Sequence, residues 1–224
     1  LIDFKFSPRT KTNNLSIRLI NKDNSKSAVV PVSVNHWENT DVQFMPEGGD
    51  LITGLKAHMG FKAIGEDGRG ANIKGRVVDE TGKQVAVFSS THKGMGDFDL
   101  IPNDNQTYTA KVEFPSGLVK DYPLPAVKRS GTVLQVKNAF KSDSVEVSIL
   151  ASPDIVQLNK SYFLTAKARG VISYAATVTF SKNAVHRFVS KNLFPSGITH
   201  FILSSTDGKP LNERLVFINR DDDL

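Results

Sequence analysis

Residues 108–114 read YTAKVEF, so that apolar Tyr, Ala, Val and Phe alternate with polar Thr, Lys and Glu. Successive side chains of a β-strand point to opposite faces, so this alternation predicts a strand with one face on a core. Residues 15–19 (LSIRL) and 145–149 (VEVSI) repeat the pattern. Apolar spacing of three and four residues, which is typical of helices, is hard to find in the chain. We therefore expect half-buried strands, as in antiparallel sheets that expose their outer face.

Short turn signals separate these alternating stretches. Residues 66–68 (EDG), 80–83 (ETGK) and 206–209 (TDGK) are examples. Glycine adopts a positive φ without steric cost and aspartate tolerates it, which suits hairpin turns. About fifteen candidate strands follow one another at a spacing of roughly 8–12 residues, which is typical of β-sandwiches. The sequence predicts an all-β fold.

The composition limits the chemistry that the chain can perform. Its 224 residues are 39% hydrophobic, which is enough to form buried cores, and they include no cysteine. A disulfide framework, a thiolate metal site, a cysteine nucleophile and a cysteine-derived thioester are therefore excluded. The net charge of +5 is a mild excess without the clustered basicity of nucleic-acid binders. No apolar run approaches the roughly 20 residues of a transmembrane span.

Two prolines divide the chain. Residues 122–126 read YPLPA, and prolines two apart favour an extended linker because they cannot donate to a sheet. We therefore predict one sandwich over residues 40–125 and a second over 126–219, each of immunoglobulin-like size. Residues 1–39 are too short for an independent domain and are predicted to be the tail of a preceding β-domain; the alternative is that their strands pair with the first sandwich.

The two ends indicate an excerpt from a longer parent chain. The first residues, LIDFK, contain neither an initiator Met nor a signal-peptide pattern, and residues 220–224 (RDDDL), with their run of three aspartates, are expected to begin a linker to a following domain. The expected partners are therefore neighbouring domains of the same parent chain.

The most distinctive stretch is residues 42–52, which read VQFMPEGGDLI, followed by GRVVD at 75–79 and GMGDF at 94–98. This combination resembles the macroglobulin-type domains of large Gram-negative envelope proteins. Residues 168–174 (ARGVISY) and 194–218 resemble the next sandwich of the same proteins, so the resemblance covers about residues 40–219.

The resemblance implies alpha-2-macroglobulin-like architecture, a string of immunoglobulin-like domains exported to the periplasm or outer membrane. Some relatives continue into a TonB-dependent receptor plug domain, and the sequence contains nothing of that kind. The thioester motif of true macroglobulins is also absent, so covalent trapping is not implied.

The glycines of these motifs have a structural interpretation. Gly48 and Gly49 after Pro46 suit a bulge or a sharp entry where a strand changes direction. The GMG turn at residues 94–96 is expected to direct Met95 and Phe98 into the core. A phosphate-binding loop would need a strand–loop–helix pattern, which does not follow either glycine pair.

No catalytic or metal-binding constellation stands out, and no cofactor is expected. The five histidines have no metal-ligand spacing, and no G-x-S-x-G elbow is present. Asp97 and Asp99 would share one face of a strand, where they would serve as Ca²⁺ ligands, as a general acid and base, or only as a solvated face.

Two short sites are candidates for binding. His36 and Trp37 precede the first sandwich, where the indole would act either as a stacking platform for sugar or as interdomain packing. Arg187 and Phe188 interleave a cation with an aromatic ring, as nucleic-acid and glycan surfaces do, but no nucleic-acid-binding motif accompanies them and no nucleic-acid partner is expected. These four residues are the predicted binding residues.

The sequence thus predicts a non-enzymatic structural or protein-interaction module of a larger exported cell-envelope protein, presenting loops and domain junctions to an envelope partner. The alternative is a carbohydrate-binding or adhesive sandwich, which would require Trp37 and the tyrosines to form an exposed strip; these are Tyr108, Tyr122, Tyr162 and Tyr174. A hydrolase with a site at the domain junction is a third, weaker hypothesis.

Overall fold

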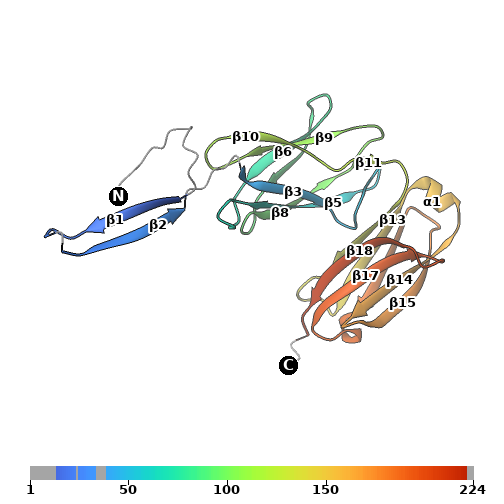
Figure 1. The fold of residues 1–224 in the computed structure, drawn as a ribbon. Helices are drawn as coiled ribbons and strands as arrows, with labels where there is room; N and C mark the ends of the chain where they lie inside the picture. Colours follow the sequence, from blue (N-terminus) through green and yellow to red (C-terminus); the bar gives the residue numbers. More distant parts are fainter. Residues whose placement is uncertain (1–13, 24, 34–38, 221–224) are drawn as a thin grey trace.

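The computed structural model describes residues 14–23, 25–33 and 39–220. This part of the chain is almost entirely β-structure, with one five-residue α-helix, α1 (Pro153–Gln157), and a 3-10 turn at Lys191–Leu193. Figure 1 shows a two-stranded hairpin followed in chain order by two bodies built from sheets. The predicted all-β fold with tandem sandwiches is confirmed.

The hairpin consists of β1 (Asn14–Ile20) and β2 (Ser27–Ser33), paired antiparallel. The register places six apolar residues on one face: Leu15, Ile17 and Leu19 opposite Val32, Val30 and Ala28. Two strands alone rarely form a stable unit in water, so this hairpin depends on contacts beyond its own pairing. The predicted origin of residues 1–39 in a preceding domain stays a prediction.

The first sandwich packs a three-stranded sheet, in the order β3-β5-β8, on a four-stranded sheet, in the order β10-β9-β6-β7. The strands are β3 (Asp41–Pro46), β5 (Ala57–Ile64), β6 (Lys74–Asp79), β7 (Gln84–Ser89), β8 (Met95–Leu100), β9 (Tyr108–Glu113) and β10 (Val119–Pro123). Four phenylalanine rings fill the space between the sheets, with Phe88 in edge, tilted and stacked contact with Phe44, Phe61 and Phe98 at centroid distances of 5.4, 5.1 and 5.5 Å. Burial of each ring stabilises the fold by roughly 1.5–3 kcal/mol.

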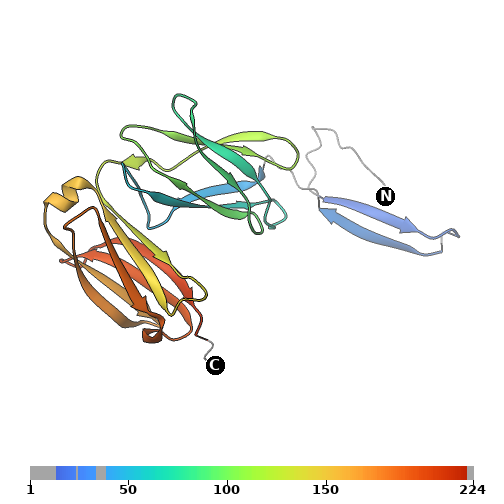
Figure 2. The same ribbon diagram turned by 180° about the vertical axis from the view of Figure 1, so that it is seen from behind.

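The second sandwich packs β12-β13-β16 on β15-β14-β17-β18. The strands are β12 (Thr132–Lys137), β13 (Ser144–Ala151), β14 (Ser161–Ala168), β15 (Val171–Thr179), β16 (Ala184–Ser190), β17 (Gly197–Ser205) and β18 (Pro210–Ile218). Inward positions of β13 and β14 are buried and their outward neighbours are not, as the alternation predicts. Figure 2 shows the β12-β13-β16 layer in front of the other sheet.

A two-stranded parallel pairing carries the chain from one sandwich to the other. β11 (Val127–Lys128) lies beyond the predicted boundary at residue 125, yet it pairs with β4 (Leu51–Ile52). Thr53 N–H also donates to the Lys128 carbonyl at 2.9 Å. The connection is thus held on the first sandwich by backbone hydrogen bonds, and it is not a free linker.

The hairpin turns form where their residues predict them. In the β6–β7 turn the Asp79 carboxylate accepts from Thr81 N–H at 3.0 Å, Thr81 Oγ1 at 2.7 Å and Lys83 N–H at 3.0 Å. These bonds, chiefly that of the Thr81 hydroxyl, hold the pKa of Asp79 below its ordinary value. Gly82 completes the turn with φ +84°, a conformation that side chains disfavour.

The expectation that the GMG turn directs both Met95 and Phe98 inward was wrong for Met95. Phe98 is buried, whereas Met95 is 45% exposed. The two residues lie three positions apart in β8, so the period of two places them on opposite faces of the strand.

Candidate functional site

The turn after β3 joins the two sandwiches. Glu47 N–H donates to the His58 carbonyl at 2.8 Å, and Gly49 N–H donates to the Pro46 carbonyl at 3.1 Å, so the turn is fixed on the first sandwich. Gly48 has φ +83°, and a Cβ there would lie 2.5 Å from the Leu134 carbonyl oxygen of β12. Gly48 is therefore required both by its own conformation and by the close approach of the second sandwich.

Glu47 reaches across the interface between the two sandwiches, which we call the joint. Its Oε1 accepts the Val136 N–H of β12 at 3.1 Å and lies 2.8 Å from Arg214 Nε of β18. The Glu47 side chain is only 10% exposed. A carboxylate at this depth needs charged or hydrogen-bonding partners, and here both come from the other sandwich.

Asn212 closes the joint from the opposite side. Its side-chain amide is buried, and Nδ2 donates to the Gly48 carbonyl at 2.7 Å and to the Thr132 carbonyl at 2.9 Å. The Thr132 hydroxyl donates to Oδ1 of the same amide. One side chain thus ties β18 to β12 and to the turn of the first sandwich, and each of its polar atoms has a partner.

Apolar contacts continue the joint beside these hydrogen bonds. Ile52 and Leu55 of the first sandwich form a buried cluster with Val133 of the second, with Leu150 packed against it. Gln135 Nε2 donates to the Lys56 carbonyl at 3.0 Å. The interface therefore combines a dry apolar core with a polar network, as rigid protein interfaces do.

A charged cavity of about 480 Å³ opens next to the joint. Within it Lys56 Nζ lies 2.6 Å from Asp99, and His58 Nδ1 lies 2.9 Å from the same carboxylate. Hydrogen bonds from Lys56 and then from His58 hold the pKa of Asp99 below its ordinary value. The predicted Asp97 and Asp99 pair does share one face of β8, with the ammonium of Lys56 on Asp99.

This cavity lacks the donor set of a metal site. In residues 14–23, 25–33 and 39–220, no group of three or more His, Asp or Glu side chains has an arrangement that would hold a metal ion. The Ca²⁺ alternative for Asp97 and Asp99 gains no support from the described geometry.

One pair has the residue types of a nucleophile and its base. Ser148 Oγ lies 2.9 Å from His186 Nδ1, and the two residues are register partners on β13 and β16. No carboxylate bonds to His186 within the described ranges, so no triad is assembled there. The contact is an ordinary cross-strand hydrogen bond.

The predicted binding residues do not come together. His36 and Trp37 lie outside the described residues. Arg187 and Phe188 are consecutive on the edge strand β16 and point to opposite faces; Phe188 is 73% exposed, and the Arg187 guanidinium donates to the His186 carbonyl at 3.1 Å. Their role in binding stays a prediction.

The tyrosines do not form an exposed strip. Tyr108 and Tyr162 are buried in the two cores. Tyr108 Oη accepts from Asn103 N–H and donates to Gln106, both at 2.9 Å, so its polar end is satisfied inside the fold. Tyr122 and Tyr174 are partly buried against the same cores.

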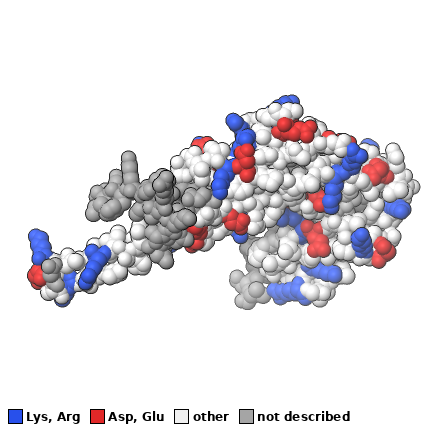
Figure 3. Space-filling view, turned by 45° about the horizontal axis from the view of Figure 1, so that its top comes forward, with Lys and Arg blue, Asp and Glu red and all other residues white. Residues whose placement is uncertain are grey.

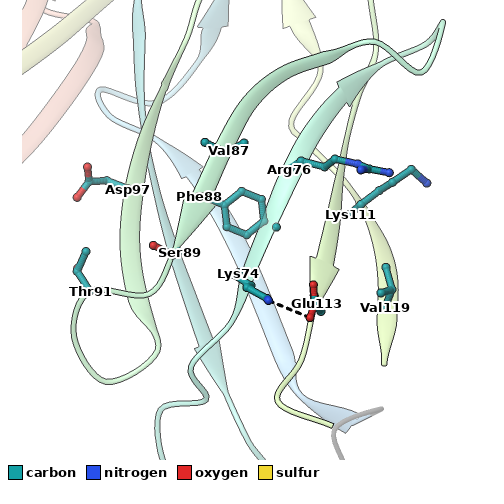
Figure 4. Close-up of a pocket in the computed structure, with 11 residues that line it drawn as sticks. Lys74, Arg76, Val87, Phe88, Ser89, Thr91, Asp97, Lys111, Glu113 and Val119 are labelled. Carbon is teal, nitrogen blue, oxygen red and sulfur yellow. Dashed lines mark ion pairs between the residues drawn. The ribbon is translucent and has the colours of Figure 1, made fainter. Parts of the chain in front are cut away.

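An open groove of about 720 Å³ crosses the first sandwich (Figure 4). Lys74 pairs with Glu113 at 3.1 Å, whereas Arg76 has no ion pair or hydrogen bond of its side chain in the described part of the chain. Figure 3, which brings the β9 and β10 side forward, shows Lys and Arg interspersed with Asp and Glu. The visible face carries no continuous basic field.

Sequence reasoning missed the joint itself. Glu47, Gly48, Asn212 and Arg214 all occur in the motifs quoted above, but periodicity gives no sign that they meet. Arg214 lies 167 positions from Glu47 in the chain. The local signal that could indicate such an interface is a polar residue, such as Asn212 or Glu47, near the end of a strand. Alternation does not show whether a residue at a strand end is buried, so this signal was not recognised.

Three comparisons with known proteins were made, against family models, curated proteins and solved structures. No family model matches the chain, and no curated protein matches it. A solved structure titled "Biofilm associated protein - BSP domain" is similar over 82% of this chain, with 13% identity and a TM-score of 0.36. This chain covers 30% of that one, under a third of its length.

The described residues contain no helix with the length and apolar character that crossing a bilayer demands.

Proposed function

We propose that this chain is a non-enzymatic structural module, in which two sandwiches are held at a fixed angle and space the neighbouring parts of a larger exported cell-envelope protein. The joint carries the proposal. Hydrogen bonds of Glu47, Asn212 and Arg214 cross the interface, and Gly48 lies against the backbone of Leu134. These contacts can form together only if the two sandwiches keep this relative orientation. A flexible linker would need none of these contacts.

Burial makes this network costly to break. Opening the joint would leave the Glu47 carboxylate without its two partners, and it would expose Ile52, Leu55 and Val133 to water. Each hydrogen bond exchanged for bonds to water costs about 0.5–1.5 kcal/mol net, and about 1.5–3 kcal/mol when one partner is charged. The angle between the sandwiches is therefore expected to be stable without a ligand.

The experiment is a distance measurement between spin labels. Because the chain has no cysteine, Glu80→Cys and Lys182→Cys give one exposed label in each sandwich. The expected result is a single narrow distance distribution that broadens when Asn212→Ala or Glu47→Gln is added. Glu113→Gln is the matched control, since it removes an exposed ion pair away from the joint. A broad distribution in the labelled parent, or an unchanged one in both joint variants, would overturn the proposal.

The second candidate is a carbohydrate-binding or adhesive module, and the groove of Figure 4 is the observation that favours it. Lys74, Arg76 and Lys111 line it together with Asp97 and Glu113. Lys74 and Lys111 are paired with carboxylates, so Arg76 is the cation that a carboxylated sugar would meet. Titration with an acidic oligosaccharide such as an oligouronate would show binding that Arg76→Gln weakens. Equal binding by the Arg76→Gln variant would remove this candidate.

The macroglobulin-type relationship and a location in the periplasm or at the outer membrane complete the proposal. They rest on the sequence motifs of residues 42–52 and 194–218. Fractionation of cells that produce the full parent protein would test the location, and recovery in the cytoplasm would contradict it.

A further inference from the structure

The outer face of the sheet β15-β14-β17-β18 is unusually apolar. Outward positions of an exposed sheet are normally polar, yet here several large apolar side chains stand among the Ser, Thr, Lys, His and Glu residues of this face. Five are more than 40% exposed: Phe163, Ile172, Ile198, Leu215 and Phe217. Figure 1 looks onto this sheet, and no other ribbon lies in front of it. We call these five residues, together with Lys167, His200, Ile202 and Glu213, the apolar outer face.

Register shows that these side chains are neighbours. Ile198 pairs with Phe217 and His200 with Leu215 across β17 and β18. Lys167 of β14 pairs both with His200 of β17 and with Ile172 of β15, so the patch spans all four strands. Its apolar centre lies on β17 and β18, and Lys167 and His200 separate that centre from Ile172. The register partners of Phe163 are Thr177 and Ser204, so this ring lies apart from the centre on the same face.

The patch is large enough to form an interface. At roughly 100 Å² for each exposed large apolar side chain, the five residues together present about 500 Å² of apolar surface. A stable interface buries about 800 Å² per partner, of which somewhat more than half is apolar. The apolar outer face thus supplies the apolar part of one standard-size interface.

The charges at its centre are of both signs. Glu213 pairs with His200 at 2.9 Å, whereas Lys167 has no ion pair among the described residues. A surface that carries both a cation with no ion pair and an exposed carboxylate complements a copy of itself, as two-fold interfaces require.

We propose that this face binds the same face of a second copy of the chain, in a two-fold symmetric, sheet-on-sheet dimer. A two-fold axis that runs parallel to the strands between β14 and β17 places β14 of one copy over β17 of the other. Lys167 of one copy then lies over His200 of the other, next to Glu213. Sheets packed in this way lie about 10 Å apart and interdigitate their apolar side chains. This inference goes beyond the proposed function and does not depend on the angle of the joint.

The test is the oligomeric state of the whole chain by sedimentation equilibrium. The expected result is a monomer–dimer equilibrium in the micromolar range, with dissociation constants at least about tenfold higher for Ile198→Lys and Leu215→Lys. Val119→Lys is the matched control, since Val119 is similarly exposed, at 55%, on the outer face of the first sandwich. Melting of each variant at high dilution checks that its monomer is folded.

A charge swap tests direct contact. Lys167→Glu and Glu213→Lys should each weaken the homodimer, while a mixture of the two variants should form a heterodimer in which both ion pairs are restored. A protein that stays monomeric would overturn the proposal. A dimer that neither apolar variant weakens would also overturn it, as would a dimer that is lost with Ile17→Lys of the hairpin and not with Leu215→Lys.

Discussion

The two four-stranded sheets have the same strand topology, but the side chains on their outer faces differ. In the first sandwich most outward residues of β6 and β9 are charged, and they pair as Lys74 with Glu113 and, through β10, Lys111 with Asp121; the smaller Val87 and Val119 are exposed beside them. In the second, the outward residues of β14, β17 and β18 include Phe163, which is 41% exposed, and other large apolar side chains. Inward side chains specify the fold. Outward side chains are not constrained by it, so their chemistry indicates whether the sheet faces water or another surface.

The largest expected effect comes from comparing inward with outward positions on one strand. Leu164 is fully buried, and its neighbour Phe163 faces outward. Leu164→Ala should lower the free energy of unfolding by about 2–5 kcal/mol because it leaves a cavity. Phe163→Ala should cost well under half of that in the monomer, as measured by urea unfolding at high dilution. Equal costs would show that the outer face is part of the core.

Substitution of Gly75, which lies beneath the charged face of the first sandwich, should have the next largest effect on stability. A Cβ on Gly75 would lie 2.3 Å from the Lys111 carbonyl oxygen and 2.6 Å from Cζ of Phe88, whose ring covers that position. Gly75→Ala should therefore destabilise the fold by about 1–3 kcal/mol, because the backbone or the ring must shift. Gly117→Ala is a comparison in which space is open and only the positive φ of the turn opposes the change. Thermal melting of the two variants separates crowding from backbone conformation.

Low pH should reduce the stability that the turn between β6 and β7 contributes. The pKa of Asp79 is lowered in the folded chain, first by the Thr81 hydroxyl, so the folded state favours the ionised carboxylate. Its stabilising contribution is present above the unfolded pKa near 4 and is lost as the pH falls through the lower folded pKa. Asp79→Asn should reduce stability at neutral pH and flatten the acid limb of the curve of unfolding free energy against pH. An acid limb identical to that of the parent would assign the acid sensitivity to other carboxylates.

The smallest effect is expected for the ion pairs of the first sandwich. Lys74 and Glu113 are both substantially exposed, at 66% and 44% of their side chains. A double-mutant cycle with Lys74→Ala and Glu113→Ala should give a coupling of roughly 0.2–1 kcal/mol that shrinks in high salt. A larger, salt-insensitive coupling would mean that the charged face is covered in solution.

Much of the fold was predictable because its causes are local. The alternation of residues 108–114 and 145–149 sets which side chains face the core, and the turn at residues 80–83 sets where the chain reverses. The candidate joint was not predictable in the same way. Gly48 was expected to form a sharp entry to a strand, and its positive φ agrees with this, but its contact with Leu134 depends on how two folded bodies meet.

The sequence by itself determined the strands, the turns, the absence of thiol chemistry and the all-β class, since each follows from neighbouring residues or from composition. The tertiary structure alone decided that Glu47 and Asn212 bind across a joint and that Ile198 and Leu215 share an uncovered face. Alternation assigns a side chain to one side of its strand. Which side is dry depends on what packs against the sheet, and that is settled only when distant strands have come together.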